Sequence, residues 1–302
     1  MKFTIVLLAL LLGMGNALAE VSVKDDQGNL VRLSGPAQRV ISLAPSLTEM
    51  LYAAGGGNTL VGAVEYSDYP PAALKVPRIG SNMHLDLERI AQLKPDLVLV
   101  WMHGNAEREI ERLRVLKIPM FFLEPHHLGD IPDGLERIGH LVGTDRVAAQ
   151  AAAQFRARHA TLQATFTRRA PVRVFYQVAD QPLMTINDQQ IISDVIHLCG
   201  GINVFGKENM LVPQLSAESV VAANPDIILT ARIGASNDHA DTTQRKPDEP
   251  SLQRWLAFHD MKAVRNGQLW LIPGDQISRH GPRIVDGAAA VCAALDAARK
   301  MP

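Results

Sequence analysis

The residues that decide the fold are Asp145 to Arg169, DRVAAQAAAQFRARHATLQATFTRR, a stretch that contains neither glycine nor proline. Along one face, side chains recur at helical spacing at Val147, Ala151, Phe155, Arg158, Leu162 and Phe166. At ~1.5 Å per residue, this pattern predicts a single helix of about 36 Å. A long helix in mid-chain favours two lobes, which we place at residues 20–144 and 170–302, joined by the helix at 145–169.

Both flanking regions alternate short apolar runs with amphipathic segments. The runs lie at 40–43, 60–64, 97–101 and 120–123 before the long helix, and at 172–178, 227–230 and 269–272 after it. Short apolar runs bounded by glycine, proline or charged residues are typical of strands buried on both faces. The predicted fold class is therefore α/β, with two lobes joined by one long rigid helix.

A helix is expected to begin directly after the first of these runs. Ser46, Leu47, Thr48 and Glu49 match a capping box, in which the serine and glutamate side chains bond to free backbone N–H groups. We predict a helix from there to Ala54, ended by the glycines at 55–57.

One pattern occurs twice in the chain. The residues LERIAQLKPDLVL at 87–99 align without a gap on AESVVAANPDIIL at 217–229, 130 residues later. Each copy predicts a short helix, a Pro-Asp turn and a buried strand. Pro-Asp is common after helices, but the shared glutamate favours a structural duplication. Glu88 and Glu218 would then occupy equivalent exposed positions on the two lobes.

Residues 1–19 have the pattern of a signal peptide. Lys2 provides the positive charge, an apolar run follows, and Ala17-Leu18-Ala19 is the small-x-small site before Glu20. No cysteine lies at that site, and the run is too short for a stable membrane span. We expect export to the periplasm, cleavage after Ala19 and a soluble mature chain.

Export changes the interpretation of the two cysteines, Cys199 and Cys292. They lie 93 positions apart without a CxxC partner, which argues against zinc and redox motifs. In an oxidising compartment this pair predicts one disulfide. Two buried free thiols are the alternative.

The charge balance gives no sign of a polyanionic partner. The chain has 30 lysines and arginines against 31 acidic residues, whereas nucleic-acid binders concentrate positive charge on one face. No nucleophile elbow, phosphate-binding loop or zinc-protease motif occurs in the sequence. Four histidines on expected loops suggest a metal, but solvated loop histidines are the simpler interpretation: His84, His103, His126 and His127.

Four stretches resemble one known family. They are YSDYPP at 66–71, Leu87 to Trp101 followed by GNAER at 104–108, CGGIN at 199–203 and GPRI at 281–284. In this order they resemble the periplasmic vitamin B12-binding proteins of ABC importers, over nearly the whole mature chain. The resemblance implies the helical-backbone class of binding proteins (class III), in which two lobes hold the ligand in a cleft without catalysis or a resident cofactor.

The resemblance also implies cleft residues. Tyr66 and Trp101 lie where the family presents aromatic faces to the corrin ring, and Asp275 lies where it has an acid on the opposite lobe. The respective alternatives are a turn residue, ordinary packing at a strand end and an Asx-turn. Smaller or more polar side chains stand where larger aromatics are expected, which indicates a corrinoid variant or weaker binding: Asn82, Met184, Val212 and Gln276.

The predicted function is therefore capture of a corrinoid, with vitamin B12 as first candidate, and delivery to an ABC importer. In the family, an exposed acid on each lobe docks to the permease dimer, and Glu88 and Glu218 match that role. Stabilisation of their helix N-termini is the alternative. We expect the protein to be a monomer.

Two other functions remain open at this point. A haem or ferric-siderophore binding protein of an ABC importer is the second candidate, although Ser81 stands where haem-binding relatives tend to offer a tyrosine. A secreted metal-dependent enzyme that uses His126, His127 and Asp275 is a remote third.

Overall fold

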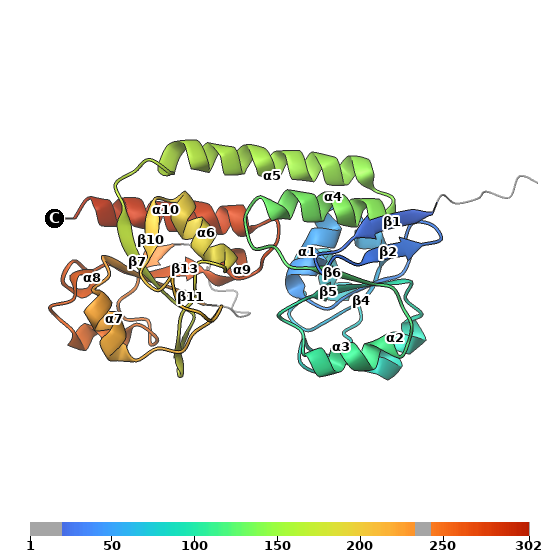
Figure 1. The fold of residues 1–302 in the computed structure, drawn as a ribbon, viewed down its shortest axis with the longest axis horizontal. Coiled ribbons are helices and arrows are strands. Elements are labelled where there is room, and N and C mark those ends of the chain that lie inside the picture. The colour runs from blue at the N-terminus through green and yellow to red at the C-terminus, as the bar shows by residue number, and fades with distance from the viewer. Residues whose placement is uncertain (1–19, 233–242, 302) are drawn as a thin grey trace, which may run out of the picture.

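The computed structural model describes residues 20–232 and 243–301. Two α/β lobes are bridged by α5, Asp145–Phe166, which runs along one side of both lobes (Figure 1). This confirms the predicted fold class, although α5 ends before the expected end at Arg169. The predicted signal peptide and its cleavage site after Ala19 lie outside the described residues. No helix in the described ranges is both long and apolar enough to span a membrane.

The N-terminal lobe is built on a parallel sheet with strand order β4-β3-β5-β6. Its strands are β3 at Val40–Ser42, β4 at Leu60–Ala63, β5 at Leu97–Trp101 and β6 at Met120–Leu123, and a hairpin of β1 (Val21–Lys24) and β2 (Leu30–Leu33) precedes them. The helices are α1 (Pro45–Ala53), α2 (Leu87–Leu93), α3 (Glu107–Arg114) and α4 (Asp130–Val142), with 3-10 turns at Gly57–Thr59 and Pro71–Lys75.

The two faces of this sheet carry separate apolar clusters. Because alternate strand residues point to opposite faces, Leu97 and Leu99 pack with α1 and α4, while Val98 and Val100 pack with α2 and α3. All four side chains are completely buried. Because helices cover both faces of the sheet, the sequences of the strands are continuous apolar runs.

The described part of the C-terminal lobe has a sheet with strand order β10-β7-β11-β13-β12, in which only the edge strand β12 is antiparallel. The strands are β7 at Val172–Gln177, β10 at Gly201–Asn203, β11 at Ile227–Arg232, β12 at Gln244–Arg245 and β13 at Leu269–Pro273, with a small hairpin of β8 (Ala179–Asp180) and β9 (Leu183–Met184). The helices are α6 (Ile191–Leu198), α7 (Ala217–Ala223), α8 (Lys262–Arg265), α9 (Gly274–Ile277) and α10 (Ile284–Arg299), with a 3-10 turn at Gln253–Ala257.

The repeated sequence pattern adopts the same local structure in both lobes. α2 and α7 each span 7 residues and end at a left-handed residue, Lys94 with φ 47° and Asn224 with φ 44°. The aspartate that follows accepts a backbone N–H from an arginine of the preceding strand region: Asp96 from Arg39 and Asp226 from Arg173, both at 2.9 Å. The duplication is therefore structural.

The sequence reasoning missed α4, which packs between the first sheet and α5. Pro132 lies in its first turn, where proline is tolerated, but Gly134 and Gly139 weaken the helical pattern. Close packing requires the glycine at 139, since a Cβ there would collide with Ala148 of α5, whereas a Cβ at Gly134 would meet the flexible end of Met50 at 2.8 Å.

The predicted capping box is wrong. α1 begins at Pro45 with Ala44 as its N-cap, and no side chain caps it. Ser46 is already inside the helix, where its hydroxyl cannot cap the first turn. The Glu49 carboxylate instead forms ion pairs with Arg279 and Arg283 of the other lobe.

The predicted disulfide is confirmed. Cys199 and Cys292 are bonded, with 4.7 Å between their Cα atoms, and no free cysteine occurs. The bond joins the C-terminal end of α6 to the middle of α10.

Candidate functional site

A cleft between the two lobes contains two adjoining cavities of about 280 and 210 Å3. Trp101, Ser278 and His280 line both cavities, so these side chains form the partition between them. The larger cavity is walled mainly by apolar side chains of the C-terminal lobe: Val178, Ile186, Ile191, Ile192, Leu211, Val212 and Ala231. An apolar cleft with a few polar groups at domain interfaces is the usual form of a small-molecule site.

Trp101 is positioned by the residues that follow it. Its backbone N–H donates to Oδ1 of the buried Asn105 at 2.9 Å, and the Asn105 amide donates to the Leu43 carbonyl at 2.8 Å. The ring folds over Gly104, where any Cβ would collide with it. The Trp-x-x-Gly-Asn spacing therefore places an aromatic wall at the carboxyl end of β5.

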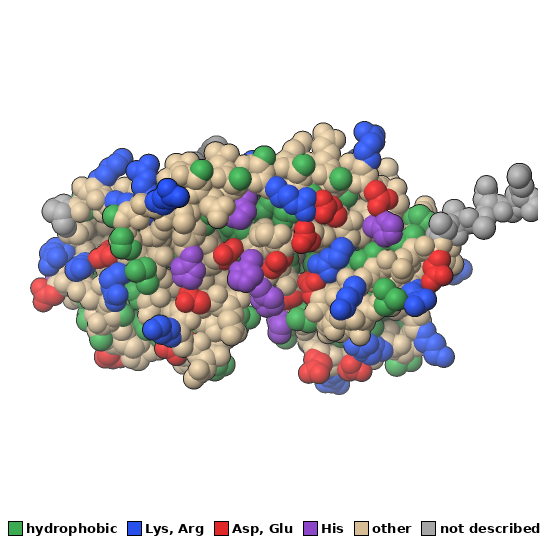
Figure 2. Space-filling view, turned by 45° about the horizontal axis from the view of Figure 1, so that its top comes forward, with side chains coloured by type: hydrophobic (Ala, Val, Ile, Leu, Met, Phe, Trp, Pro, Cys, Tyr) green, Lys and Arg blue, Asp and Glu red, His purple; other side chains and the backbone are tan. Residues whose placement is uncertain are grey.

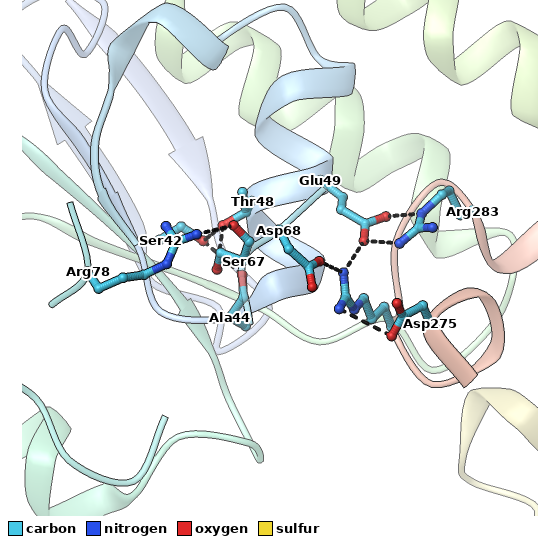
Figure 3. Close-up of polar contacts among 10 residues, drawn as sticks. Ser42, Ala44, Thr48, Glu49, Ser67, Asp68, Arg78, Asp275 and Arg283 are labelled. Atoms are coloured by element: carbon cyan, nitrogen blue, oxygen red, sulfur yellow. Dashed lines mark hydrogen bonds and ion pairs between the residues drawn. The ribbon is translucent and has the colours of Figure 1, made fainter. Parts of the chain in front are cut away.

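Tyr66 forms a wall of the smaller cavity. Its backbone has φ 62°, a strained value for a bulky residue, and the residue is 65% exposed. The neighbouring Ser67 is buried, with its carbonyl bonded to Arg78 at 2.7 Å and its hydroxyl 3.2 Å from that of Thr48 (Figure 3). The chain thus anchors Ser67 in the core and leaves Tyr66 exposed at the cavity wall.

Some of the remaining predicted ligand-binding residues line a cavity, and others do not. Asn82 and Ser81 line the smaller cavity, and Asn82 donates to the Gly104 carbonyl at 2.9 Å, which braces the loop below Trp101. Val212 lines the larger cavity. Met184 and Asp275 line neither cavity: Met184 lies in β9, and Asp275 pairs with Arg279 at 3.2 Å. Gln276 likewise lies outside both linings.

Histidine side chains gather along the groove between the lobes (Figure 2). His103 and His126 line the larger cavity with ring centroids 6.4 Å apart. Each has one ring nitrogen near a protein oxygen, with His103 Nδ1 3.6 Å from Glu124 and His126 Nδ1 3.3 Å from the Gln189 carbonyl.

His280 reaches the partition from the opposite lobe. Its ring meets Trp101 edge-on, with centroids 5.8 Å apart, and its Nε2 lies 3.1 Å from the Gln190 amide nitrogen. Burial, assisted by the nearby His126, lowers the pKa of His280 to about 4. The imidazole is therefore neutral between pH 5 and 8.

The residues of the enzyme alternative do not converge. His127 Nδ1 lies 3.6 Å from Asp194, His126 faces Gln189, and Asp275 pairs with Arg279. Over residues 20–232 and 243–301, no three His, Cys, Asp or Glu side chains are arranged to hold a metal ion.

Comparison with known proteins identifies the family. The family model described as periplasmic binding protein matches residues 40–276. The chain belongs to the periplasmic binding proteins. This family consists of binding components rather than enzymes, which confirms the expectation drawn from the missing catalytic motifs.

Several similar proteins are named vitamin B12-binding protein. The chain is 36% identical over 266 residues to a vitamin B12-binding protein of Vibrio cholerae, which covers 88% of this chain and 91% of that protein. It is 36% identical over 256 residues to one of Yersinia pestis, covering 85% of each. The crystal structure of the periplasmic vitamin B12-binding protein BtuF of Vibrio cholerae superposes with a TM-score of 0.78 at 36% identity, covering 88% of this chain and 99% of that one.

More distant structures share the fold alone. A periplasmic haem-binding protein of Pseudomonas aeruginosa has a TM-score of 0.71 at 22% identity, and covers 85% of this chain and 92% of its own. At this identity the likeness establishes only the two-lobed architecture of the binding protein.

A cluster of charges, which we call the Glu49 cluster, joins the lobes of this binding protein beside the cleft. Arg279 lies 3.1 Å from Glu49, 2.6 Å from Asp68 and 3.2 Å from Asp275, and Arg283 contacts both Glu49 oxygens at 2.6 and 2.8 Å (Figure 3). Although burial lowers the pKa of Arg279, the hydrogen bond that it donates to Asp68 and the charge of Asp275 hold this pKa above its ordinary value.

The Glu49 cluster accounts for Asp68 and Tyr69 of the YSDYPP motif. Asp68 supplies one carboxylate, and the Tyr69 ring lies 3.9 Å below the Arg283 guanidinium carbon. One loop of the N-terminal lobe therefore provides both a cavity wall and a contact between the lobes.

Proposed function

We propose that this binding protein captures a corrinoid, with vitamin B12 as first candidate, between its two lobes and delivers it to an ABC importer. The observation that carries the proposal is the cleft with Trp101 and Tyr66 at its walls, in a chain 36% identical to vitamin B12-binding proteins along most of its length. Aromatic faces suit a flat macrocycle because they bury a large area with few rotatable bonds.

The dimensions of the cleft indicate how such a ligand would be held. Each cavity lies at or below the lower end, about 300 Å3, of small-molecule pockets, so a corrin macrocycle requires the two to be joined. Their shared partition consists of side chains, which move more easily than backbone. Binding would then combine apolar burial against the C-terminal lobe with stacking on the N-terminal lobe.

Haem is the second candidate, and it is favoured by the three histidines that line the larger cavity, His103, His126 and His280. Against it stands Ser81, whose hydroxyl accepts the backbone N–H groups of Met83 and His84 at 3.3 and 3.2 Å and so stabilises a turn. A serine in that role offers no phenolate to iron. Corrinoid capture therefore remains the proposal.

Glu88 and Glu218 are proposed to dock the two lobes onto the permease dimer. Both are exposed in the first turn of matching helices, α2 and α7, which lie on the side of the molecule away from α5 (Figure 1). Exposed charges set orientation and association rate without an apolar patch. Near Glu218, its own backbone N–H and the Ser216 hydroxyl lower the pKa of the carboxyl group, which keeps it charged.

We also propose that the protein is exported to the periplasm and that its signal peptide is cleaved. Residues 1–19 have the required pattern, and the disulfide between Cys199 and Cys292 suits an oxidising compartment. A monomer suffices for this role because the cleft is formed within one chain.

Calorimetric titration of the purified mature protein with cyanocobalamin, haemin and a ferric siderophore tests the proposed ligand. We expect saturable 1:1 binding of cyanocobalamin and much weaker heat from the other two. Preferential binding of haemin, with a Soret band in the purified protein, would replace the corrinoid by the second candidate.

Docking is tested with Glu88→Arg combined with Glu218→Arg. We expect loss of importer-dependent uptake and of stimulated ATP hydrolysis in vesicles, with cyanocobalamin affinity unchanged. Glu107→Arg combined with Glu111→Arg, which reverses two other acids of the N-terminal lobe on α3, is the matched control and should retain uptake. Normal uptake by the Glu88/Glu218 variant would contradict the docking role.

A further inference from the structure

The position of His280 is fixed by its neighbours on both sides. Arg279 before it is held in the Glu49 cluster, with only 9% of its side chain exposed. At Gly281 after it, an added Cβ would lie 3.3 Å from the Ser46 carbonyl of α1, so the loop runs directly against the other lobe. The imidazole is therefore presented to the cleft by an anchored segment.

Gln190 determines which ring nitrogen of His280 carries the proton. The Gln190 Oε1 accepts the backbone N–H of Ile192 at 2.6 Å, as the cap of α6, so its nitrogen faces His280 at 3.1 Å. An amide nitrogen donates, which makes His280 Nε2 the acceptor. Since the neutral ring carries one proton, that proton lies on Nδ1.

Two N–H donors in the partition consequently lack acceptors. Within the described residues, neither His280 Nδ1 nor Trp101 Nε1 has a hydrogen-bond partner, although both atoms are buried. They come from opposite lobes and belong to rings in edge-on contact. Buried donors are almost always satisfied in proteins, so an unpaired pair at the centre of a cleft calls for a ligand that supplies acceptors.

We propose that His280 is a ligand-recognition residue that donates its Nδ1–H, alongside the Nε1–H of Trp101, to carbonyl oxygens on the rim of the bound macrocycle. This inference rests on the proposed function, because the corrin rim carries carboxamide side chains whose carbonyls are such acceptors. It also assigns Gln190 as a positioning residue, which acts through the tautomer of His280. The ligand would separate the two rings and join the two cavities.

A matched pair of variants tests this role. The His280→Asn variant retains an amide donor near the position of Nδ1. The His280→Leu variant has a side chain of nearly the same shape as asparagine but no donor. In cyanocobalamin titrations we expect His280→Leu to weaken binding about tenfold and His280→Asn to remain within about threefold of the wild type. Equal affinities of the leucine variant and the wild type would overturn the inference.

The tautomer is measured independently of any ligand. Nitrogen-15 NMR of the ligand-free protein should show the His280 proton on Nδ1, and a proton on Nε2 would overturn the inference. The Gln190→Leu variant should lose this preference, a change that a merely structural role of Gln190 would not produce. Absence of cyanocobalamin binding by the wild type would instead contradict the proposed function itself.

Discussion

The lobes meet at two polar regions that differ in how their groups are paired. In the Glu49 cluster, both arginines lie within 3.2 Å of carboxylate oxygens. At the partition, by contrast, Trp101 and His280 each keep a buried N–H without an acceptor among the described residues. The comparison separates two tasks. The ion-paired cluster holds the lobes together, and the two unpaired N–H groups are available to a ligand.

The two regions share a single chain segment. Asp275 and Arg279 belong to the Glu49 cluster, and His280 is the next residue along the chain. Because ion pairs fix the segment, the recognition group is preorganised, which lowers the entropy lost on binding. Disrupting the Glu49 cluster should therefore mainly lower stability, and disrupting the partition should mainly weaken ligand binding.

The largest effect is expected from Glu49→Gln. The side chain of Glu49 is only 2% exposed, and the change leaves the buried Arg279 and the partly buried Arg283 with too little negative charge. Removing one member of a buried ion cluster typically costs about 3–5 kcal/mol. Denaturant unfolding should show this loss, whereas the exposed Glu88→Gln should change stability by less than ~0.5 kcal/mol. A Glu49 effect as small as the control would mean that the cluster does not hold the lobes.

The next effect is expected from the joint replacement Cys199→Ser and Cys292→Ser. Loss of a native disulfide costs roughly 2–5 kcal/mol. The bond lies within the C-terminal lobe, and neither cysteine lines a cavity. Unfolding measurements should show the loss while the cyanocobalamin Kd stays within about threefold. A large change in Kd would show that the disulfide also shapes the cleft.

A smaller effect is expected from pH. The pKa of His280 is lowered to about 4, below the ~6.5 of an unfolded histidine, so the unfolded chain binds more protons between these values. Stability should therefore fall as pH decreases from about 6.5 towards 4, by up to about 2 kcal/mol between pH 7 and 5. His280→Asn should remove this part of the pH dependence. If the variant and the wild type lose the same unfolding free energy between pH 7 and pH 5, His280 is not the source of this pH dependence.

Sequence patterns were informative where local structure depends on neighbours in the chain. The apolar run at 97–101 predicted that Trp101 ends a strand, and Asn105 and Gly104 hold it there through local contacts. Glu88 and Glu218 likewise followed from a repeat in which each copy forms its own helix and turn.

Sequence patterns failed for residues whose contacts lie in the other lobe. Glu49 has the spacing of a helix cap, yet its partners lie more than 200 positions away, with separations of 230 and 234 residues. His280 was not singled out at all, because its tautomer depends on Gln190 and its placement on the Glu49 cluster. Only the neighbouring GPRI motif at 281–284 signalled that the segment matters.

The central claim, that Trp101 forms part of the ligand site, is tested most directly by the cyanocobalamin Kd of Trp101→Ala. We expect binding to weaken by about 2 kcal/mol or more, roughly 30-fold, as for an aromatic anchor at the centre of an interface. Trp270→Ala, which removes the same side chain from β13 outside both cavities, is the matched control and should bind like the wild type. A Kd for Trp101→Ala equal to that of the wild type would contradict the account.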